Sequence, residues 1–369
     1  MSLQQYRSLG RSGLVISPLA LGTMTFGMAR WGMDKSKASE VFNAYVDAGG
    51  NFIDTADVYS GGVSEEMLGD MISARGLREQ VVVATKSGFS AGAHPHGGGN
   101  GSKHVVSALE ASMRRLKTDY IDLYWAHVWD SVTPPEELLA TMSNLVRSGK
   151  VRYWGLSNAP AWYVAKISGL AQAHGLSGPI AMQYFYSLVN RDVEDEHVPL
   201  GLDSGIGIVP WSPLAFGLLT GKYDRAAVAA RGKLSGGLPT GAAGPNEVRP
   251  DNDKRLDGSN PFGDSLFTER NWKIVETVKM VAAEASITPA DVALAWVVSR
   301  RGVSSTLIGV SNLSQLQSNI LALEVKLSEH HLALLDTATA DNSRMLYSLF
   351  GAVTRKHAVF GGNDVQPWR

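Results

Sequence analysis

Four side chains could perform acid–base chemistry together: Asp54, Tyr59, Lys86 and His127. Asp54 is the first charge after the apolar pair Phe52–Ile53, and Tyr59 follows five residues later on a predicted loop. A carboxylate at the end of a buried strand is costly to bury alone, so we expect it to pair with a cation. A tyrosine beside that cation could donate a proton near neutral pH, because a positive charge favours the phenolate.

Each of these residues also has an ordinary structural interpretation. Asp54 could cap the helix that follows it. Lys86 could be an exposed loop lysine, and His127 could be a hydrogen-bonded histidine beside Trp125 and Trp129. However, Asp54, Lys86 and His127 lie at or just beyond the ends of three successive apolar segments. This shared position favours a common site over separate structural roles.

The elements that must position these side chains alternate regularly. Short apolar segments alternate with amphipathic ones, which predicts parallel strands connected by helices. Eight such units in roughly 300 residues are typical of a closed (β/α)8 TIM barrel, whose strand ends converge on one face. An open doubly wound sheet is the alternative, but no G-x-G-x-x-G motif opens a helix after an early strand. The expected strands are 19–23, a strand ending at 53, 81–86, 120–125, 151–156, 180–184, 206–211 and 307–309.

Capping residues and periodicity predict the helices. Asp34 is expected to cap a helix over 35–48, and Ser64 to cap the helix after the second strand. Thr133 to Glu136 has the pattern of a capping box, with proline at the first helical position. A β-hairpin over 6–16 is predicted before the barrel, and 1–369 is interpreted as one domain. The remaining expected helices are 103–117, 160–173 and 313–321.

Three stretches interrupt this alternation. The loop 87–102 contains six glycines together with His94 and His96, and we expect it to be mobile. Residues 221–267 form a long insertion after the seventh strand, and we predict that it clamps a cofactor. Residues 340–369 form a C-terminal tail of uncertain order, whose apolar residues need either the barrel mouth or a partner subunit to cover them.

Composition limits the class of protein. The 369 residues are 44% hydrophobic, which is ample for a sizeable core. The net charge of −1 and the lack of a long basic run argue against nucleic acid and membrane as partners. No cysteine is present, no signal peptide is visible and no apolar run could span a bilayer. We therefore expect a cytoplasmic monomer or homo-oligomer.

With these residues in this order, the sequence resembles a known family, the aldo-keto reductase superfamily. The resemblance covers about residues 7 to 338 and is closest to the branch with aryl-alcohol dehydrogenase-like enzymes and potassium-channel β subunits. The motifs stand in the family's order. They are Phe52-Ile53-Asp54-Thr55-Ala56 with Tyr59 and Gly69, Thr85-Lys86, Asp119-Tyr120-Ile121-Asp122-Leu123-Tyr124 before His127, Gly155-Leu156-Ser157-Asn158, Gln183-Tyr184 and Trp211-Ser212-Pro213-Leu214.

The resemblance implies NADPH-dependent reduction of aldehydes or ketones by a tetrad of Asp54, Tyr59, Lys86 and His127. In these roles Tyr59 donates a proton to the carbonyl oxygen while Lys86 perturbs the phenol. Asp54 holds Lys86, and His127 orients the substrate oxygen. Such a site needs no metal, so His94 and His96 are weak ligand candidates.

The resemblance also implies which residues bind the NADPH or NADP cofactor. Trp211 stands where tyrosine is commoner, and its ring would stack on the nicotinamide. The 309–312 segment lacks the basic residue that many members place there for the 2′-phosphate, which leaves the Ser311 hydroxyl, the Gln315 amide and the helix N-terminus. Lys222, with Arg225, Arg231 or Lys233 of the insertion, could add charge. The cofactor-binding candidates are Gly22, Thr23, Met24, Asp54, Ser157, Asn158, Gln183, Trp211, Ser212, Pro213, Leu214, Gly217, Lys222, Gly309, Ser311, Gln315 and Asn319.

An aromatic, apolar mouth is expected for the substrate, which suits aryl or hydrophobic carbonyl compounds and the matching alcohols. No arginine is obviously placed for a carboxylate or phosphate on the substrate. A regulatory subunit that binds NADPH as a sensor is the alternative, since the tetrad residues alone do not exclude it. The substrate-pocket candidates are Phe26, Trp31, Tyr59, His127 and Trp129.

Overall fold

The computed structural model describes residues 2–29, 31–231, 254–256, 264–340 and 345–366. Most of the 221–267 insertion, including Lys233, therefore lies outside the described residues. The same holds for the start of the C-terminal tail at 341–344 and for its last three residues.

Eight parallel strands form a barrel, as predicted. Their order is β10-β3-β4-β5-β6-β7-β8-β9, and a bridge between Ile208 and Val303 joins β9 to the segment before β10. Every neighbouring pair within this order is parallel. The strands are β3 (Leu19–Gly22), β4 (Phe52–Asp54), β5 (Val82–Ser87), β6 (Ile121–Ala126), β7 (Val151–Ser157), β8 (Ala181–Phe185), β9 (Gly207–Trp211) and β10 (Thr306–Gly309).

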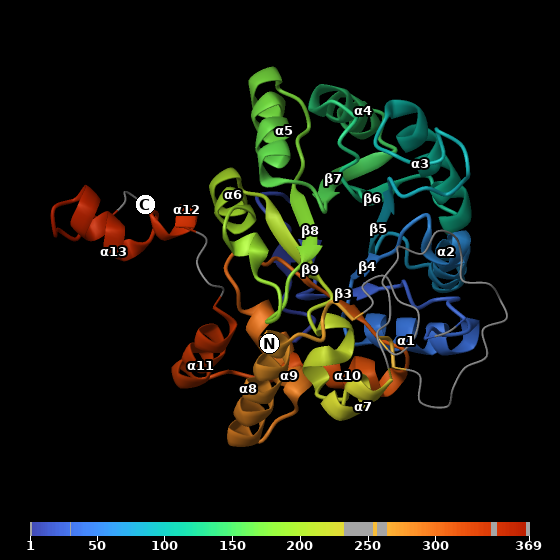
Figure 1. Ribbon diagram of the computed structural model, residues 1–369. Coiled ribbons are helices and arrows are strands. Elements are labelled where there is room, and N and C mark those ends of the chain that lie inside the picture. Colours follow the sequence, from blue (N-terminus) through green and yellow to red (C-terminus); the bar gives the residue numbers. More distant parts are fainter. Residues whose placement is uncertain (1, 30, 232–253, 257–263, 341–344, 367–369) are drawn as a thin grey trace.

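Helices surround the strands on the outside (Figure 1). Their buried apolar residues and the outward residues of the strands form one continuous core layer, and Trp154 and Trp296 are fully buried in it. The helices are α1 (Lys35–Asp47), α2 (Val63–Arg75), α3 (Ser102–Leu116), α4 (Pro135–Arg147), α5 (Ala161–His174), α6 (His197–Ser204), α7 (Arg225–Ala230), α8 (Glu269–Ala285), α9 (Pro289–Val298), α10 (Leu313–Leu321), α11 (Glu329–Thr339), α12 (Met345–Ser348) and α13 (Ala352–Thr354).

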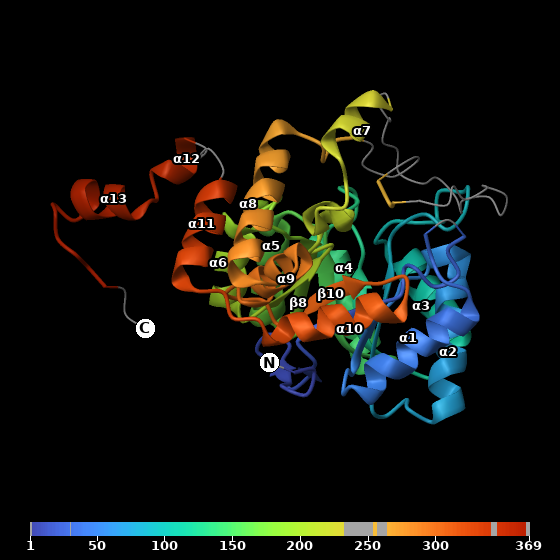
Figure 2. The ribbon, with the colours of Figure 1, turned by 90° about the horizontal axis from the view of Figure 1, so that it is seen from below.

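The predicted hairpin, β1 (Arg7–Ser8) and β2 (Val15–Ile16), lies beneath the barrel near the N-terminus (Figure 2). Leu9 and Ile16 are fully buried against inward-facing barrel residues such as Phe52 and Trp125. The hairpin therefore closes the barrel at its N-terminal end, which leaves the opposite end for a site.

Helix capping follows the prediction at one of three places. Asp34 accepts a hydrogen bond from the Lys37 amide at 2.9 Å, as expected for an N-cap. The predicted cap at Ser64 is wrong, because left-handed Gly62 begins α2 and the Ser64 hydroxyl donates instead to the Thr23 carbonyl at 2.8 Å. Its position inside the helix lets it tie α2 to the end of β3.

The predicted capping box at 133–136 is also wrong. Pro134 is the N-cap residue and makes no side-chain cap hydrogen bond, although Pro135 does occupy the first helical position. The Thr133 hydroxyl donates to Asp130 at 2.7 Å instead. Asp130 also accepts from the backbone amides of Val132 and Thr133, so a carboxylate-centred turn orders the chain before α4.

Two helices that the sequence patterns did not predict, α8 and α9, lie between the insertion and β10. Thr288 and Asp291 form a capping box at the start of α9. Among the described residues no single helix is long and apolar enough to cross a membrane; α8 and α9 pass that test only together, across a 98° bend.

The C-terminal tail extends away from the barrel beyond α6 and α11 in both views (Figures 1 and 2). The apolar residues of the tail were predicted to pack either on the barrel mouth or on a partner subunit. They do not pack on the mouth of their own barrel.

Candidate active site

The four candidate catalytic residues meet at the C-terminal ends of three adjacent strands. Asp54 ends β4, Lys86 is the last but one residue of β5, and His127 follows β6 directly. Tyr59 begins the 3-10 helix Tyr59–Gly62 after β4. Parallel register aligns these strand ends, since Lys86 pairs with Trp125 and Asp54 with Ala84. The predicted convergence of the four residues is therefore what the structure shows.

Asp54 and Lys86 form a fully buried ion pair. The Lys86 ammonium donates to Asp54, to the Thr55 carbonyl at 2.7 Å and to the Tyr59 hydroxyl at 3.3 Å. These three acceptors match the three protons of an ammonium group. Burial opposes the charge of Lys86, but Asp54 and Tyr59 outweigh it, so the pKa of Lys86 is raised. Lys86 is thus a fixed cation at neutral pH.

The second oxygen of Asp54 is held by two neutral donors. The Trp125 indole N–H donates to it at 2.9 Å and the Gln183 amide at 3.0 Å. Burial raises the pKa of Asp54, whereas Lys86, Gln183 and Trp125 all act to lower it. With hydrogen bonds to both of its oxygens, the carboxylate is fixed in position, which the pairing of a buried charge requires.

Trp125 is a functional contact that the sequence patterns did not identify. Its indole ring fits because residue 155 is glycine: a Cβ there would lie 2.5 Å from the Trp125 ring. A fully buried tryptophan needs a partner for its N–H. That requirement was the available signal, although β5 separates the strand of Trp125 from the strand of Asp54.

Tyr59 is the partly exposed member of the four, whereas Asp54, Lys86 and His127 are buried. The net effect on its phenol differs from the expectation of a pKa near neutral. Burial raises the pKa of Tyr59, and the nearby Lys86 ammonium offsets only part of that rise. Tyr59 is therefore protonated at neutral pH, which is the form that a proton donor needs.

His127 provides a neutral imidazole next to the phenol. Burial lowers the pKa of His127 well below its usual range, and the charge of Lys86 lowers it further. The rings of Tyr59 and His127 meet edge to face, with centroids 6.0 Å apart. The ring of Phe89 also meets the His127 ring edge to face, with centroids 4.5 Å apart. The His127 Nδ1 atom is buried without a hydrogen-bond partner among the described residues. A neutral imidazole in this position can bind a polar ligand atom.

Behind the tetrad lies a second charged cluster that the sequence patterns also missed. Glu65 is fully buried and accepts from Arg115 at 2.6 Å and from the Thr85 hydroxyl at 2.5 Å. Asp57, two residues before Tyr59, is 6% exposed and its Oδ1 has no partner among the described residues. Burial and the neighbouring Glu65 raise the pKa of Asp57 to about 7.

Four of the predicted cofactor residues are linked to the tetrad by hydrogen bonds. The Asn158 amide donates to the His127 carbonyl at 3.0 Å, and its oxygen accepts from the Trp211 indole at 3.2 Å. Ser157 donates to the Gln183 carbonyl at 2.9 Å. Asn158 has φ of 49°, a left-handed conformation that costs energy outside glycine. The network fixes a polar rim at the ends of β7, β8 and β9.

Trp211 stacks on Phe185, with ring centroids 5.0 Å apart and planes 20° apart. The cofactor-binding candidates between Ser212 and Gly217 follow it. Ser212 and the 3-10 helix Ala215–Thr220 that begins just after it contain several left-handed residues, including Phe216 and Gly217. Backbone strain of this kind is concentrated at functional sites.

Gly217 has a specific packing reason, because a Cβ there would lie 2.7 Å from the Nζ of Lys222. Lys222 therefore folds back over the loop that contains Leu214 and Pro213. This places a cation against strained backbone, the chemistry of a phosphate cradle.

The candidates for the 2′-phosphate lie at the start of α10. Asn312 caps this helix by accepting from the Gln315 amide at 2.9 Å. The Gln315 side-chain oxygen accepts from the Ser311 amide and hydroxyl at 2.9 and 3.2 Å. Gly309 is exposed at the end of β10, whereas Asn319 is buried inside the helix. A polar helix N-terminus therefore stands at the strand end, where a phosphate is favoured.

The mouth residues divide into core and rim. Gly22 lies close to Leu307, and Thr23 is fully buried with its hydroxyl 2.8 Å from that of Ser64. Phe26 is fully buried in the core. Trp129 is partly buried and meets Trp162 edge to face at 5.8 Å.

Arg255, from the insertion, lies at the mouth of the barrel. Its guanidinium lies 4.4 Å from the Trp31 ring centroid and 4.6 Å from that of Phe216, with an Nη2 atom 3.9 Å from the Met24 sulfur. Arg255 was not among the residues predicted to line this mouth. Burial lowers the pKa of Arg255 to about 10, and Tyr59 opposes that shift. No pattern in the sequence connects residue 255 to residues 24 and 31.

Arg255 has no carboxylate partner among the described residues, and the titratable groups that act on it are Tyr59 and Tyr223. A cation at the mouth that stacks on two aromatic rings, with no counter-ion in the described part of the chain, suits an anionic ligand.

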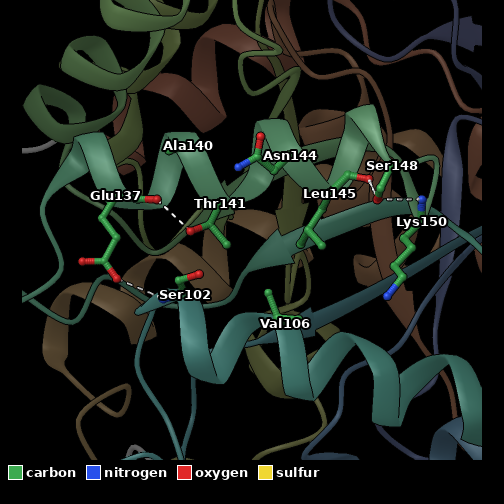
Figure 3. Close-up of a pocket in the computed structure, with 9 residues that line it drawn as sticks. All are labelled: Ser102, Val106, Glu137, Ala140, Thr141, Asn144, Leu145, Ser148 and Lys150. Carbon is green, nitrogen blue, oxygen red and sulfur yellow. Dashed lines mark hydrogen bonds between the residues drawn. The ribbon is translucent and has the colours of Figure 1, made fainter.

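Other groupings do not add chemistry. Within the described ranges no three His, Asp or Glu side chains are arranged to hold a metal ion, and His94 and His96 belong to no such group. A hollow of about 520 Å³ lies between α3 and α4 on the outside of the barrel (Figure 3). Its lining includes Val106, Glu137 and Leu145, and none of the tetrad.

Comparisons with known proteins agree with this geometry. The model of the aldo/keto reductase family matches residues 18–340. A probable voltage-gated potassium channel subunit beta from Arabidopsis thaliana is 35% identical over 87% of this chain and 92% of its own length. An aryl-alcohol dehydrogenase [NADP(+)] from Phanerodontia chrysosporium is 32% identical over 92% of this chain and 86% of its own. Norsolorinic acid reductase B from Dothistroma septosporum is 33% identical over 90% and 81%.

An eight-stranded parallel barrel with this set of strand-end residues defines an oxidoreductase of the barrel class. The chain belongs to the aldo/keto reductase family. The predicted family and the predicted fold are both confirmed.

Proposed function

We propose that the protein is an NADPH-dependent oxidoreductase that reduces aldehydes or ketones to alcohols, and catalyses the reverse with NADP. Aryl or hydrophobic carbonyl compounds are the proposed substrates. The observation that carries this proposal is the contact between the Lys86 ammonium and the Tyr59 hydroxyl, at 3.3 Å, next to a buried Asp54.

The residues present fit a nicotinamide dinucleotide. Trp211, Asn158 and Gln183 form a polar and aromatic rim beside the tetrad. Lys222 and the strained loop at 212–217 suit a diphosphate, and the start of α10 suits the adenosine end. When bound, the reduced cofactor supplies a hydride to the carbonyl carbon.

Tyr59 would then donate its proton to the carbonyl oxygen as negative charge develops there. Lys86 stabilises the phenolate that remains, because its ammonium already contacts the oxygen. His127, neutral because of its burial, would bind the same carbonyl oxygen and orient it. Asp54 does not touch the substrate in this scheme; it holds Lys86 in place.

The substrate class follows from the rim. Trp31 and Trp129 supply apolar ring surface near the mouth. The ring of Trp129 also contacts that of Trp162, which is 56% exposed. The relatives named as an aryl-alcohol dehydrogenase and a norsolorinic acid reductase support this class of compound.

The test is a panel of aromatic and aliphatic aldehydes, ketones and alcohols, assayed with NADPH and with NADP by the absorbance of the reduced nicotinamide. We expect turnover in the usual range for enzymes, about 1–10³ s⁻¹, with at least one aromatic aldehyde such as 4-nitrobenzaldehyde. Tight NADPH binding with turnover below about 0.01 s⁻¹ for the whole panel would instead favour an NADPH-binding sensor subunit. The similarity to potassium channel β subunits keeps that second function open.

A further inference from the structure

The C-terminal arm, defined here as residues 345–366, carries an exposed apolar surface. It extends away from the barrel beyond α6 and α11 (Figures 1 and 2), and it lies beyond the residues that the family model matches. Leu349, Phe350 and Val353 are 55%, 66% and 75% exposed. Exposed apolar residues that lie close together in this way are typical of an interaction site.

The arm is also basic. Arg355, Lys356 and His357 follow one another immediately after the apolar residues. Lys356 pairs with Asp364 at 2.7 Å, within the arm itself. Arg355 and His357 are exposed. A partner for this arm therefore needs apolar surface bordered by carboxylates.

The barrel of the same chain carries such a surface. The acidic segment, residues 192–203, contains five carboxylates and neither lysine nor arginine. Asp192, Asp195 and Glu196 are exposed in it, and Leu202 is a 42% exposed apolar residue on α6. Arm and acidic segment are thus complementary in charge and in apolar character.

The base of the arm lies beside this segment, since the Tyr347 hydroxyl donates to Glu196 at 2.5 Å. The remainder of the arm points outward, away from its own barrel (Figure 1). A two-fold axis next to the Tyr347–Glu196 contact would bring the arm of each copy onto the acidic segment of the other. Such an arrangement satisfies both surfaces with one kind of chain, which is how most closed dimers are built.

We propose that the C-terminal arm of one copy packs on the acidic segment of a second copy and holds the protein as a reciprocal dimer. Leu349 and Phe350 supply the apolar contacts of this dimer. Arg355 meets the carboxylate of Asp195 of the second copy.

The test is sedimentation or light scattering of the full-length protein across a concentration series up to about 100 µM, where association of micromolar strength is visible. Wild type should be dimeric. Leu349→Asp/Phe350→Asp should weaken association at least about tenfold, as removal of a central apolar contact does. Leu321→Asp is the matched control, because Leu321 is 62% exposed on α10, and it should remain dimeric.

Charge exchange tests the partner surface separately. Arg355→Glu and Asp195→Lys should each weaken the dimer, and a chain with both substitutions should recover it. Since all these side chains lie on the surface of the arm or of the acidic segment, circular dichroism should show unchanged folding. A monomeric wild type would overturn the proposal and assign the arm to a different partner. An oligomer unaffected by the arm variants, or a chain with both charge substitutions that does not recover the dimer, would also overturn it.

Discussion

The ammonium of Lys86 lies 3.3 Å from the phenol oxygen of Tyr59, while its other contacts are the Asp54 carboxylate and the Thr55 carbonyl. Lys86 has no freedom to pair elsewhere, because all of its protons are engaged. The positive charge beside the phenol is therefore a permanent part of the folded protein. It acts against the burial that raises the pKa of Tyr59.

Replacing Lys86 with methionine should move the pH dependence of alcohol oxidation. Oxidation needs the Tyr59 phenolate as base, so its rate rises with pH through the pKa of that phenol. Removal of the ammonium removes the effect that lowers this pKa, and the rise should shift to higher pH with a lower kcat at pH 7. The measurement is kcat/KM for an aromatic alcohol against pH. Lys35→Met, an exposed lysine paired with Asp70, is the control. An unshifted profile in Lys86→Met would show that the ammonium does not act on Tyr59.

Asp57 should make stability depend on pH. Its pKa in the folded protein is about 7, above the usual 3.8. Between these values the folded protein keeps a proton that the unfolded chain has lost, so the free energy of unfolding falls as pH rises through this window. In wild type this decrease in the free energy of unfolding amounts to at most about 4 kcal/mol at pH 8, and Asp57→Asn should remove it.

The measurement is urea unfolding of wild type and Asp57→Asn at pH 5 and pH 8. The variant should gain stability relative to wild type between the two pH values, whereas the exposed Asp119→Asn should follow wild type throughout. If the difference between Asp57→Asn and wild type is the same at both pH values, Asp57 is not protonated in the folded protein near neutral pH.

The comparison of sequence with structure separates local from long-range information. The alternation of strands and helices and the strand-end positions of Asp54, Lys86 and His127 are local patterns, and they predicted the barrel and the convergence of the tetrad. The predicted caps at Ser64 and Thr133 are wrong because both hydroxyls donate to other acceptors, the Thr23 carbonyl and the Asp130 carboxylate. A capping motif reports that a hydroxyl is available, but not which acceptor is nearest after folding.

The sequence patterns could not predict the direction of the pKa shift of Tyr59 or the contacts between residues far apart in the chain. The pKa of Tyr59 depends on how much burial opposes the charge of Lys86, and burial is a property of the packed structure. The contact of Arg255 with Trp31 joins positions that are separated by more than half of the chain. The Trp125–Asp54 hydrogen bond depends on the space left by Gly155, on the next strand.

Arg255 should contribute to cofactor binding as a cation without a counter-ion among the described residues. We predict that Arg255→Ala raises the Kd for NADPH at least about tenfold and reduces its dependence on salt. Arg255→Lys should lie in between, because lysine keeps the charge but not the planar stacking. Quenching of tryptophan fluorescence measures the Kd. Arg225→Ala is the matched control, since Arg225 is exposed and pairs with Glu269. Equal affinities for Arg255→Ala and Arg225→Ala would remove Arg255 from the cofactor site.

Cofactor preference should depend on the start of α10. We predict that wild type favours NADPH over NADH by at least about tenfold in kcat/KM, or about 1.4 kcal/mol. Gln315→Glu puts a carboxylate next to Ser311, where the 2′-phosphate is proposed to bind, and should reduce that preference by repulsion. Gln317→Glu, on the exposed face of the same helix, is the control. Equal use of both cofactors by wild type would contradict a dedicated phosphate site.

The most direct test of the account is Tyr59→Phe, measured for kcat and for NADPH affinity in the same preparation. The substitution keeps the ring that meets His127 and removes only the hydroxyl that Lys86 contacts. The account predicts a loss in kcat of at least about a hundredfold, the size expected for general acid catalysis, with the Kd for NADPH nearly unchanged. A variant that retains most of its kcat would show that Tyr59 is not the proton donor.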